Sequence, residues 1–371
     1  MRAFILIPFA VCIYEIVSLI LPLKLPLYGR ILAYAILLSG LLKGMLYRQT
    51  PTGFEIIELP YGGALFISVI FNFIIVAFFM LLVKDAIFII WKIFSRVKFP
   101  GYYTSLFVFS LAACTTLYGT YEGLKLPPVV NHEVKIKNLA PEFENFKIAM
   151  LVDIHADELT NESAVQKIVD RTNALNPDLI LIPGDFVDGS VKARSKDLAP
   201  IKNLKAKFGV LGVTGNHEYY FDYHGWLKEI QNFGVRLLMN EHVIINSGDA
   251  KLIIAGIPDI TSLMMGFTAP NLEQALKDAP DEPIILMDHR PDAARENAKY
   301  KIALQVSGHT HGGQMPGMYQ LVKRANKGFI RGWYEIANMK LYVSPGTSQW
   351  NGFAFRLFDP SEISLFTLRS E

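Results

Sequence analysis

Two histidines, His309 and His311, stand one residue apart in the stretch SGHTHGGQ at residues 307–314, next to glycines. The whole chain has only eight histidines, so this pair is a candidate for chemistry. Imidazole nitrogen is the commonest metal ligand among side chains. A single short motif also arises by chance, and the metal hypothesis therefore depends on further donors in comparable settings.

Four further groups of acidic, amide or imidazole residues meet that condition, because each follows a short apolar run that predicts a buried strand. Asp153 and His155 follow KIAMLV (147–152), Asp185 and Asp188 follow DLILIP (178–183), Asn216, His217 and Glu218 follow FGVLGVT (208–214), and Asp288 and His289 follow PIILM (283–287). The His309–His311 pair follows ALQVS (303–307). Five strands therefore deliver donors at their carboxyl ends, where sheets of this class form a ligand crevice.

The elements that must position these donors are alternating strands and helices. Apolar residues between Val165 and Leu175 recur at helical spacing, between the first two strands. Further strands are predicted at KLIIAG (251–256) and LYVS (341–344), and the alternating residues Val134–Ile136 suit an edge strand. This order predicts an α/β fold in which helices flank layered β-sheets.

The first third of the chain has a different character. Hydrophobic residues make up 51% of the sequence, and their excess is concentrated there. About four transmembrane helices are predicted, at Ala3–Leu23 (interrupted by Glu15), Ile31–Tyr47, Ala64–Val83 and Tyr102–Tyr121. The first run is open to a second interpretation, a cleaved signal peptide, although no small-x-small cleavage site follows it. AIFIIW (86–91) is expected to continue the third helix or to lie at the membrane interface.

The predicted organisation has three parts: a multi-pass transmembrane region at 1–121, a linker with an edge strand at 122–146, and a catalytic α/β domain at 147–371. The net charge of +2 gives no indication of a nucleic-acid-binding surface. Both cysteines, Cys12 and Cys114, lie in apolar runs, so no disulfide framework is predicted.

The series D-x-H, G-D-x-x-D, G-N-H-E, H and G-H-x-H, in this order, resembles the calcineurin-like metallophosphoesterases over roughly residues 130–371. The resemblance implies a layered sandwich of two mixed β-sheets flanked by helices. SGHTHGGQ and SPGTSQWNGFAFR are most similar to the membrane-associated bacterial branch of the family. The first motif departs from the common pattern, with Val152 before Asp153 and HADEL after it, which leaves the loop shape and the substrate fit open.

The resemblance implies a phosphoester hydrolase with two divalent metal ions (Mn, Fe or Zn) that activate a bridging hydroxide for in-line attack on phosphorus. It assigns Asp185 as the bridging ligand. The remaining protein ligands would be Asp153, His155 and His311 at the first metal, and Asn216, His289 and His309 at the second.

Other residues receive supporting roles by the same resemblance. His217 would approach the phosphoryl oxygens or the leaving group and act in catalysis together with Asp185. Asn216 and Arg356 would bind substrate, with Arg290 a weaker candidate for phosphate binding. Asp188 and Glu218 are open between orienting their neighbours and being solvated loop acids. His132, His224 and His242 lie outside every motif and are expected to be ordinary loop or surface residues.

The natural substrate is hypothesised to be lipid-linked or delivered at the membrane, because the helices would tether the catalytic domain near the bilayer. The alternatives are a pyrophosphate hydrolase of a nucleotide-linked lipid, a non-catalytic membrane scaffold, and a transporter with an accessory domain. Positive residues are expected in the first and third connecting segments (Lys24, Arg30, Lys84, Lys92, Arg96 and Lys98). The positive-inside tendency then predicts a multi-pass cell-membrane protein with an extracytoplasmic catalytic domain.

Overall fold

The computed structural model describes residues 2–50 and 53–371 and divides into two compact units. The helical unit comprises Met1–Arg48, Ile56–Gly123 and Gly352–Phe355. The α/β unit comprises Gln49–Glu55, Leu124–Asn351 and Arg356–Glu371. The segment Gly352–Phe355 therefore belongs to the helical unit, although both of its sequence neighbours belong to the α/β unit.

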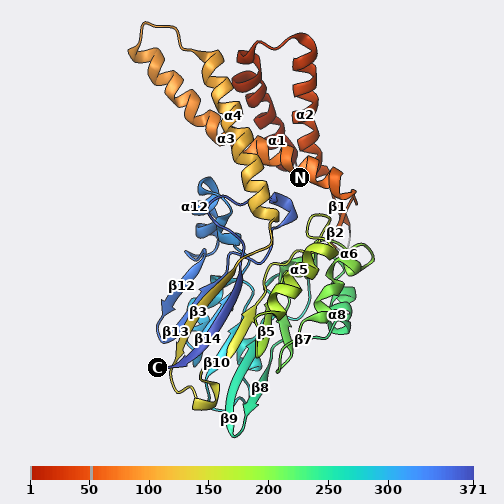
Figure 1. The fold of residues 1–371 in the computed structure, drawn as a ribbon, viewed down its shortest axis with the longest axis vertical. Helices are drawn as coiled ribbons and strands as arrows, with labels where there is room; N and C mark the ends of the chain where they lie inside the picture. Colours follow the sequence, from red (N-terminus) through yellow and green to blue (C-terminus); the bar gives the residue numbers. More distant parts are fainter. Residues whose placement is uncertain (1, 51–52) are drawn as a thin grey trace. The chain divides into compact units, whose positions relative to one another are not determined.

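The helical unit has one α-helix in each of the four predicted apolar runs (Figure 1). They are α1 (Arg2–Glu15), α2 (Leu27–Met45), α3 (Tyr61–Phe94) and α4 (Gly101–Leu124). A π-helical turn (Ile16–Ile20) and a 3-10 turn (Leu21–Leu23) prolong α1. A short hairpin of β1 (Tyr47–Thr50) and β2 (Gly53–Ile56), which the sequence did not predict, follows α2.

Among the described residues, α3 is the one helix long and apolar enough to cross a membrane. Its 34 residues span about 51 Å at the α-helical rise, more than the roughly 30 Å of bilayer hydrocarbon. The apolar helices at Phe9–Leu23 and Leu27–Leu41 are shorter, and serine, threonine and glycine dilute the apolar content of α4. The predicted four-helix transmembrane region is thus supported for one helix, and its multi-pass character stays a proposal.

Polar side chains pack inside the helical unit. The hydroxyl of Tyr14 donates to Asp85 Oδ2 at 2.7 Å, and Lys84 Nζ lies 3.3 Å from Asp85 Oδ1. Glu15 is fully buried, and among the described residues neither of its carboxylate oxygens has a hydrogen-bond partner. The sequence analysis placed Lys84, Lys92 and Arg30 in connecting segments, which was wrong: Lys84 and Lys92 lie within α3, which AIFIIW continues, and Arg30 lies within α2.

The α/β unit contains two mixed six-stranded sheets (Figure 1), as the resemblance implies. The first has the order β3 (Val129–Ile136), β14 (Ile363–Ser370), β4 (Lys147–Met150), β5 (Leu179–Pro183), β6 (Val210–Val213) and β7 (Val235–Leu237). The second has the order β12 (Gly332–Ile336), β13 (Met339–Val343), β11 (Ile302–Ser307), β10 (Ile284–Met287), β9 (Ala250–Gly256) and β8 (Glu241–Ser247).

Within each sheet, the strands that carry donors pair with one another in parallel. In the first sheet β4, β5 and β6 pair in parallel, with Ile180 opposite Val210. In the second, β10 and β11 pair in parallel, with Met287 opposite Val306. Parallel neighbours end at the same edge of a sheet, so the loops that follow these strands start side by side.

The main core lies between the two sheets, because side chains alternate between the faces of each strand. Leu179 and Leu181 of β5 belong to the same buried cluster as Ile285 and Met287 of β10. A second buried cluster, which includes Ile284 and Leu286, covers the opposite face of the second sheet.

Helices flank the sheets. They are α5 (Glu162–Asn173), α6 (Val191–Leu198), α7 (Asn216–Tyr220), α8 (Tyr223–Asn232), α9 (Thr261–Met264), α10 (Leu272–Ala275), α11 (Ala294–Asn297) and α12 (Pro316–Ala325). Asn161 caps α5 by accepting from the backbone amides of Ser163 and Ala164. Val165, Ile168 and Val169 then form its buried face, as the predicted periodicity requires.

Candidate metal centre

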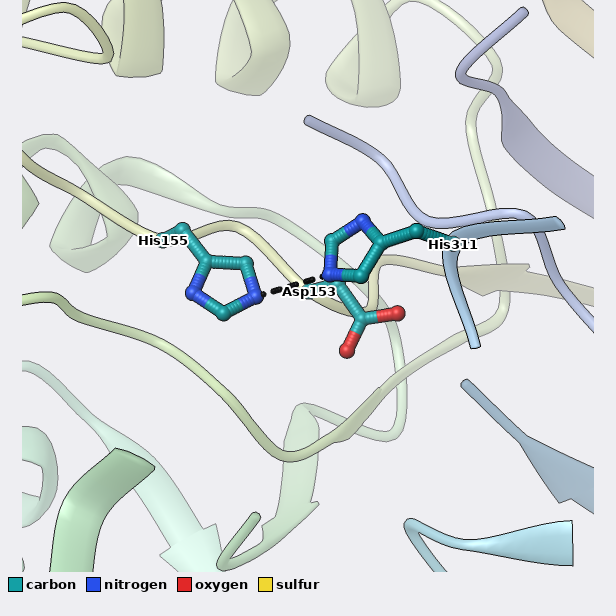
Figure 2. Close-up of side chains that lie close together, drawn as sticks. All are labelled: Asp153, His155 and His311. Atoms are coloured by element: carbon teal, nitrogen blue, oxygen red, sulfur yellow. Dashed lines mark hydrogen bonds between the residues drawn. The ribbon is translucent and has the colours of Figure 1, made fainter. Parts of the chain in front are cut away.

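The loop after β4 brings the first predicted donors into one place. Asp153 and His155 are fully buried and lie with His311 in a group whose donor atoms are all within 4.8 Å of one another. Figure 2 shows the three side chains converging, with His155 Nε2 3.1 Å from His311 Nε2. One carboxylate oxygen and two imidazole nitrogens at this spacing can hold a divalent cation.

Asp185, after β5, lies beside both predicted ligand sets. Its Oδ2 is 3.6 Å from His155 Nε2 and 3.2 Å from His289 Nε2. It also forms one donor group with His289 and His309, and another with His155 and His217. A carboxylate has two oxygens. The position of Asp185 between the two predicted ligand sets is therefore the position that a ligand shared by two metals requires.

The second predicted set assembles from three different loops. Asn216 Oδ1 lies 3.3 Å from His289 Nε2. The rings of His289 and His309 are 5.3 Å apart between centroids. The backbone amide of His309 also donates to Asp153 Oδ2 at 2.9 Å, which joins the second set to the first.

Glycine makes two of these close approaches possible. A Cβ atom on Gly215 would lie 2.1 Å from Asp185 Oδ1, and one on Gly308 would lie 2.6 Å from Asp153 Oδ2. No side chain fits at either distance, so the glycines before Asn216 and His309 let the backbone approach the two carboxylates.

Asp188 orients two histidine rings at once. Its Oδ1 lies 3.0 Å from His155 Nδ1 and also makes a short contact with His217 Nδ1. A carboxylate that accepts from Nδ1 turns Nε2 of each ring toward the centre of the site. Asp188 is 1% exposed, so it is an orienting residue and not a solvated loop acid.

Glu218 and His289 are also held by buried partners. The carboxylate of Glu218 accepts from the backbone amides of Gly215, Phe186 and Asp185 at 2.7, 2.7 and 3.1 Å. Glu218 therefore ties the loop after β6 to the loop after β5. His289 Nδ1 lies 2.8 Å from the carbonyl oxygen of Pro183, which directs Nε2 toward Asp185.

Charge is unevenly distributed over the site. Burial opposes the ionisation of Asp185, yet His289 and His217 hold its pKa well below the ordinary value. Burial raises the pKa of Asp153. Burial also disfavours the charged form of His217, but Asp188 and Asp185 outweigh it and raise its pKa to about 9. The raised pKa favours the protonated form of His217.

His309 and His311 have the opposite character. Burial, followed by the positive charge of Arg290, lowers the pKa of His309 well below its ordinary value. Burial and the charge of Arg356 do the same to the pKa of His311. Both rings are therefore neutral at physiological pH, which is the form of imidazole that binds metals.

The two arginines that the sequence suggested for phosphate are both engaged with protein groups. Arg290 pairs with Asp259 Oδ2 at 2.8 Å and donates to Thr261 Oγ1 at 3.1 Å. Arg356 is fully buried and donates to the carbonyl oxygen and to Nδ1 of His311. Phosphate binding by either arginine stays a prediction.

Three residues near the site were missed by the sequence reasoning, although the stretch SPGTSQWNGFAFR that contains them was singled out. Thr347 Oγ1 accepts from the backbone amide of Val152 at 3.0 Å. Ser348 donates its amide to the carbonyl oxygen of Asp153 at 3.1 Å. The ring of Trp350 lies 6.5 Å from that of His217.

The histidines outside the motifs have ordinary partners. His242 Nδ1 contacts the carbonyl oxygen of Ala275, and His224 packs against Tyr223 and Phe267. His132 is not a loop residue, because it lies on β3 and stacks on Phe366. None of the three belongs to a metal-capable donor group within the described ranges.

The predicted donors fit a divalent metal centre. Seven donor residues (Asp153, His155, Asp185, Asn216, His289, His309 and His311) converge on one another, and their oxygen and nitrogen atoms are the set that Mn, Fe or Zn accepts. His217 also lies in one of the donor groups, so its exclusion from the ligands stays a prediction. Asp185 belongs to two of these donor groups, one with His155 and His217 and one with His289 and His309.

Comparison with known proteins identifies the family to which the chain is similar. Residues 146–313 match the family model described as calcineurin-like phosphoesterase. The chain is 31% identical over 269 residues to a "Transmembrane protein with metallophosphoesterase domain" of Danio rerio, covering 70% of this chain and 61% of the relative. It is 30% identical over 260 residues to an uncharacterized metallophosphoesterase of Aquifex aeolicus (strain VF5), covering 69% of this chain and 97% of the relative.

A solved structure titled as a novel archaeal phosphodiesterase is also similar, at 15% identity and a TM-score of 0.29. It covers 54% of this chain and 84% of the other, and at this score it bears on neither fold nor function. The chain spans about three-fifths of the length of the vertebrate relatives it matches.

Proposed function

This chain belongs to the calcineurin-like phosphoesterase family, and from that premise we propose that it is a membrane-anchored, metal-dependent phosphoester hydrolase with a dinuclear centre. The observation that carries the proposal is the position of Asp185, which shares donor groups with His155 on one side and with His289 and His309 on the other. The family is one of hydrolases that use divalent metals, so the hydrolytic activity itself follows from membership.

The chain's own residues would divide the work as follows. Asp153, His155 and His311 would hold one metal, Asn216, His289 and His309 would hold the other, and Asp185 would serve both. When bound, two such ions supply a nucleophile from water and neutralise phosphoryl charge. His217 donates its proton to the leaving oxygen as the bond from phosphorus to that oxygen breaks, and Asp188 keeps its ring in place.

Membrane anchoring rests on α3 and on the relatives that are named transmembrane proteins. A tethered catalytic unit experiences a high local concentration of any substrate in the same bilayer. We therefore propose a phosphoester substrate that is lipid-linked or delivered at the membrane. Pyrophosphate cleavage of a nucleotide-linked lipid is the second candidate, since the same centre can accept either phosphoryl group.

The test uses purified full-length protein with Mn²⁺. We expect hydrolysis of bis(p-nitrophenyl) phosphate or p-nitrophenyl phosphate that EDTA abolishes and that Asp185→Asn lacks. Vesicles containing a phospholipid, and separately a nucleotide-linked lipid, are then compared with their soluble headgroup analogues by phosphorus NMR. Turnover of soluble esters alone removes the lipid part of the proposal. A metal-loaded protein that hydrolyses none of these substrates favours the scaffold instead.

A further inference from the structure

The helix that follows the loop of His311 is amphipathic and exposed. α12 begins five residues after His311, and its backbone packs on the same loop, because a Cβ atom on Gly313 would lie 2.9 Å from Tyr319 Cα. The apolar residues of α12 share one face at helical spacing (Met318, Leu321, Val322 and Ala325). Every residue of the helix keeps some exposure to solvent, and Leu321 is 62% exposed. An apolar helical face is therefore open to solvent next to the loop that carries a predicted metal ligand.

A second large apolar side chain is exposed close to this helix. Phe358 is 77% exposed, and its φ of 68° is a left-handed conformation that bulky residues rarely adopt. Its neighbours are both held by other segments. The amide of Leu357 donates to the carbonyl oxygen of Gln314 at 2.8 Å, and Asp359 forms an ion pair with Arg331. These contacts tie the loop of Phe358 to the segments directly before and after α12.

The charge of this region is positive. Lys323 and Arg324 lie in the last turn of α12, and Lys327 and Arg331 follow it. Residues 309–334 contain no aspartate or glutamate. Arg331 is paired with Asp359, whereas Arg324 and Lys327 are exposed. A helix with basic residues on its polar face and apolar residues on the other is typical of elements that lie at the surface of an anionic membrane.

We propose that the exposed side chains of α12, together with Lys327 and Phe358, form a surface that docks the α/β unit on an anionic lipid bilayer. Leu321 and Phe358 would enter the boundary between head groups and acyl chains, and Arg324 and Lys327 would bind lipid phosphates. The inference rests on the proposed function, because a docking surface next to His311 brings the metal centre close to lipid head groups. All of these residues belong to the α/β unit, so the unit would contact lipid by itself, in addition to the proposed anchor α3.

The test measures whether single labelled side chains reach lipid in the full-length protein. Leu321→Cys and Phe358→Cys are each labelled with bimane in a Cys114→Ser background, in which the remaining Cys12 is buried. Asp249→Cys is the matched control. Asp249 is exposed in the turn before β9, and β9 pairs with β10 in parallel, so this turn lies at the sheet edge opposite the metal loops. The protein is placed in nanodiscs that contain a doxyl-labelled phosphatidylcholine as quencher, in EDTA so that no lipid is turned over.

Two lipid compositions are compared, phosphatidylcholine alone and an equal mixture of phosphatidylcholine and phosphatidylglycerol. We expect strong quenching at positions 321 and 358 in the mixture, and little at position 249 in either. Labels at 321 and 358 that stay unquenched in both compositions overturn the proposal and favour a soluble acidic partner for this surface. Equal quenching in the two compositions overturns the assignment to anionic lipid.

Charge variants test the role of the basic residues. Arg324→Gln together with Lys327→Gln should lower the ratio of docked to undocked protein by about 25-fold, because each basic residue near an anionic surface contributes about fivefold to binding. Lys251→Gln together with Lys301→Gln is the control, because both lysines are exposed at the amino ends of β9 and β11. Unchanged quenching in the Arg324 and Lys327 variant contradicts the role of these charges.

Kinetics separate this inference from the proposed function. The Arg324→Gln and Lys327→Gln protein should hydrolyse p-nitrophenyl phosphate like the wild type, since neither residue is among the donors, while its kcat/KM for phosphatidylglycerol in vesicles should fall together with docking. A wild-type protein whose labels are quenched but which hydrolyses no ester removes the proposed function and leaves the docking surface. Hydrolysis without quenching removes only the docking surface.

Discussion

At the scale of single residues, Asp188 links the two chemical tasks of the site. Its Oδ1 contacts Nδ1 of His155, a predicted ligand, and Nδ1 of His217, the predicted proton donor. The same carboxylate helps to raise the pKa of His217 to about 9, after burial has acted against it. The ring orientation of His155 and the pKa of His217 therefore both depend on Asp188. Hydrogen bonds to an ionised carboxylate are stronger than those to a neutral side chain.

Asp185→Ala and His217→Ala should separate metal binding from proton transfer. The first removes the carboxylate shared by two donor groups, so we expect loss of both ions and of hydrolysis. The second leaves the seven predicted ligands intact, so the protein should keep its metal and turn over about 10²–10⁴-fold more slowly. Elemental analysis beside an aryl phosphate assay measures both. Full metal content in Asp185→Ala would show that Asp185 does not bridge.

At the scale of elements, a buried glutamate joins the two sheets. Glu362, directly before β14, accepts from Ser364 at 2.6 Å and from the hydroxyl of Tyr342 on β13. His132 Nε2 on β3 lies 3.7 Å from the same carboxylate oxygen. Burial favours the neutral form of Glu362, but these donors, His132 first, outweigh it and lower the pKa of Glu362.

Stability should fall in acid because of this cluster. The pKa of Glu362 in the folded state lies below its ordinary value of 4.5, so the folded state binds fewer protons than the unfolded state. The stabilisation is complete above about pH 4.5 and is lost as the pH falls through the lowered pKa. Glu362→Gln should flatten this part of the profile of unfolding free energy against pH, as measured by urea titration. The exposed Glu335→Gln on β12 should not, and an unchanged acid limb in Glu362→Gln would contradict the assignment.

At the scale of the whole molecule, the charges that flank the helices bear on orientation. Lys84 and Lys92 lie within α3, which leaves Arg96 and Lys98 in the segment that joins α3 to α4. Lys24 ends the turn that follows α1. On the proposed multi-pass topology, the positive-inside tendency still favours a cytoplasmic location for these two connections, although fewer residues support it than the sequence suggested. The α/β unit, which follows α4, would then lie outside the cytoplasm.

Protease added to intact cells that express the protein should therefore release the α/β unit. A blot against a C-terminal tag should show loss of the full-length band, while a cytoplasmic marker stays uncut. Permeabilised cells supply the positive control for the protease. Protection of the tag in intact cells, with digestion after permeabilisation, would reverse the orientation.

The sequence by itself determined the donors and the strands that deliver them. Asp153, Asp185, Asn216, His289 and His309 each follow an apolar run, and every one of those runs is a strand in the structure. This was possible because a buried strand needs a short apolar run and its carboxyl end is marked by the first polar residues after it. The strands β7, β8, β12 and β14 were not identified beforehand, since their weaker patterns depend on neighbours that are distant in the chain.

Only the tertiary structure decided which residues around the donors form hydrogen bonds with one another. The sequence left Asp188 and Glu218 open, and the structure shows each buried between loops that lie about thirty residues apart in the chain. It also shows that Arg356 contacts His311 Nδ1, and that the residues directly before Arg356 belong to the helical unit. Spacing along the chain carries no information about such pairs, because they form when loops from different strands meet and exclude water.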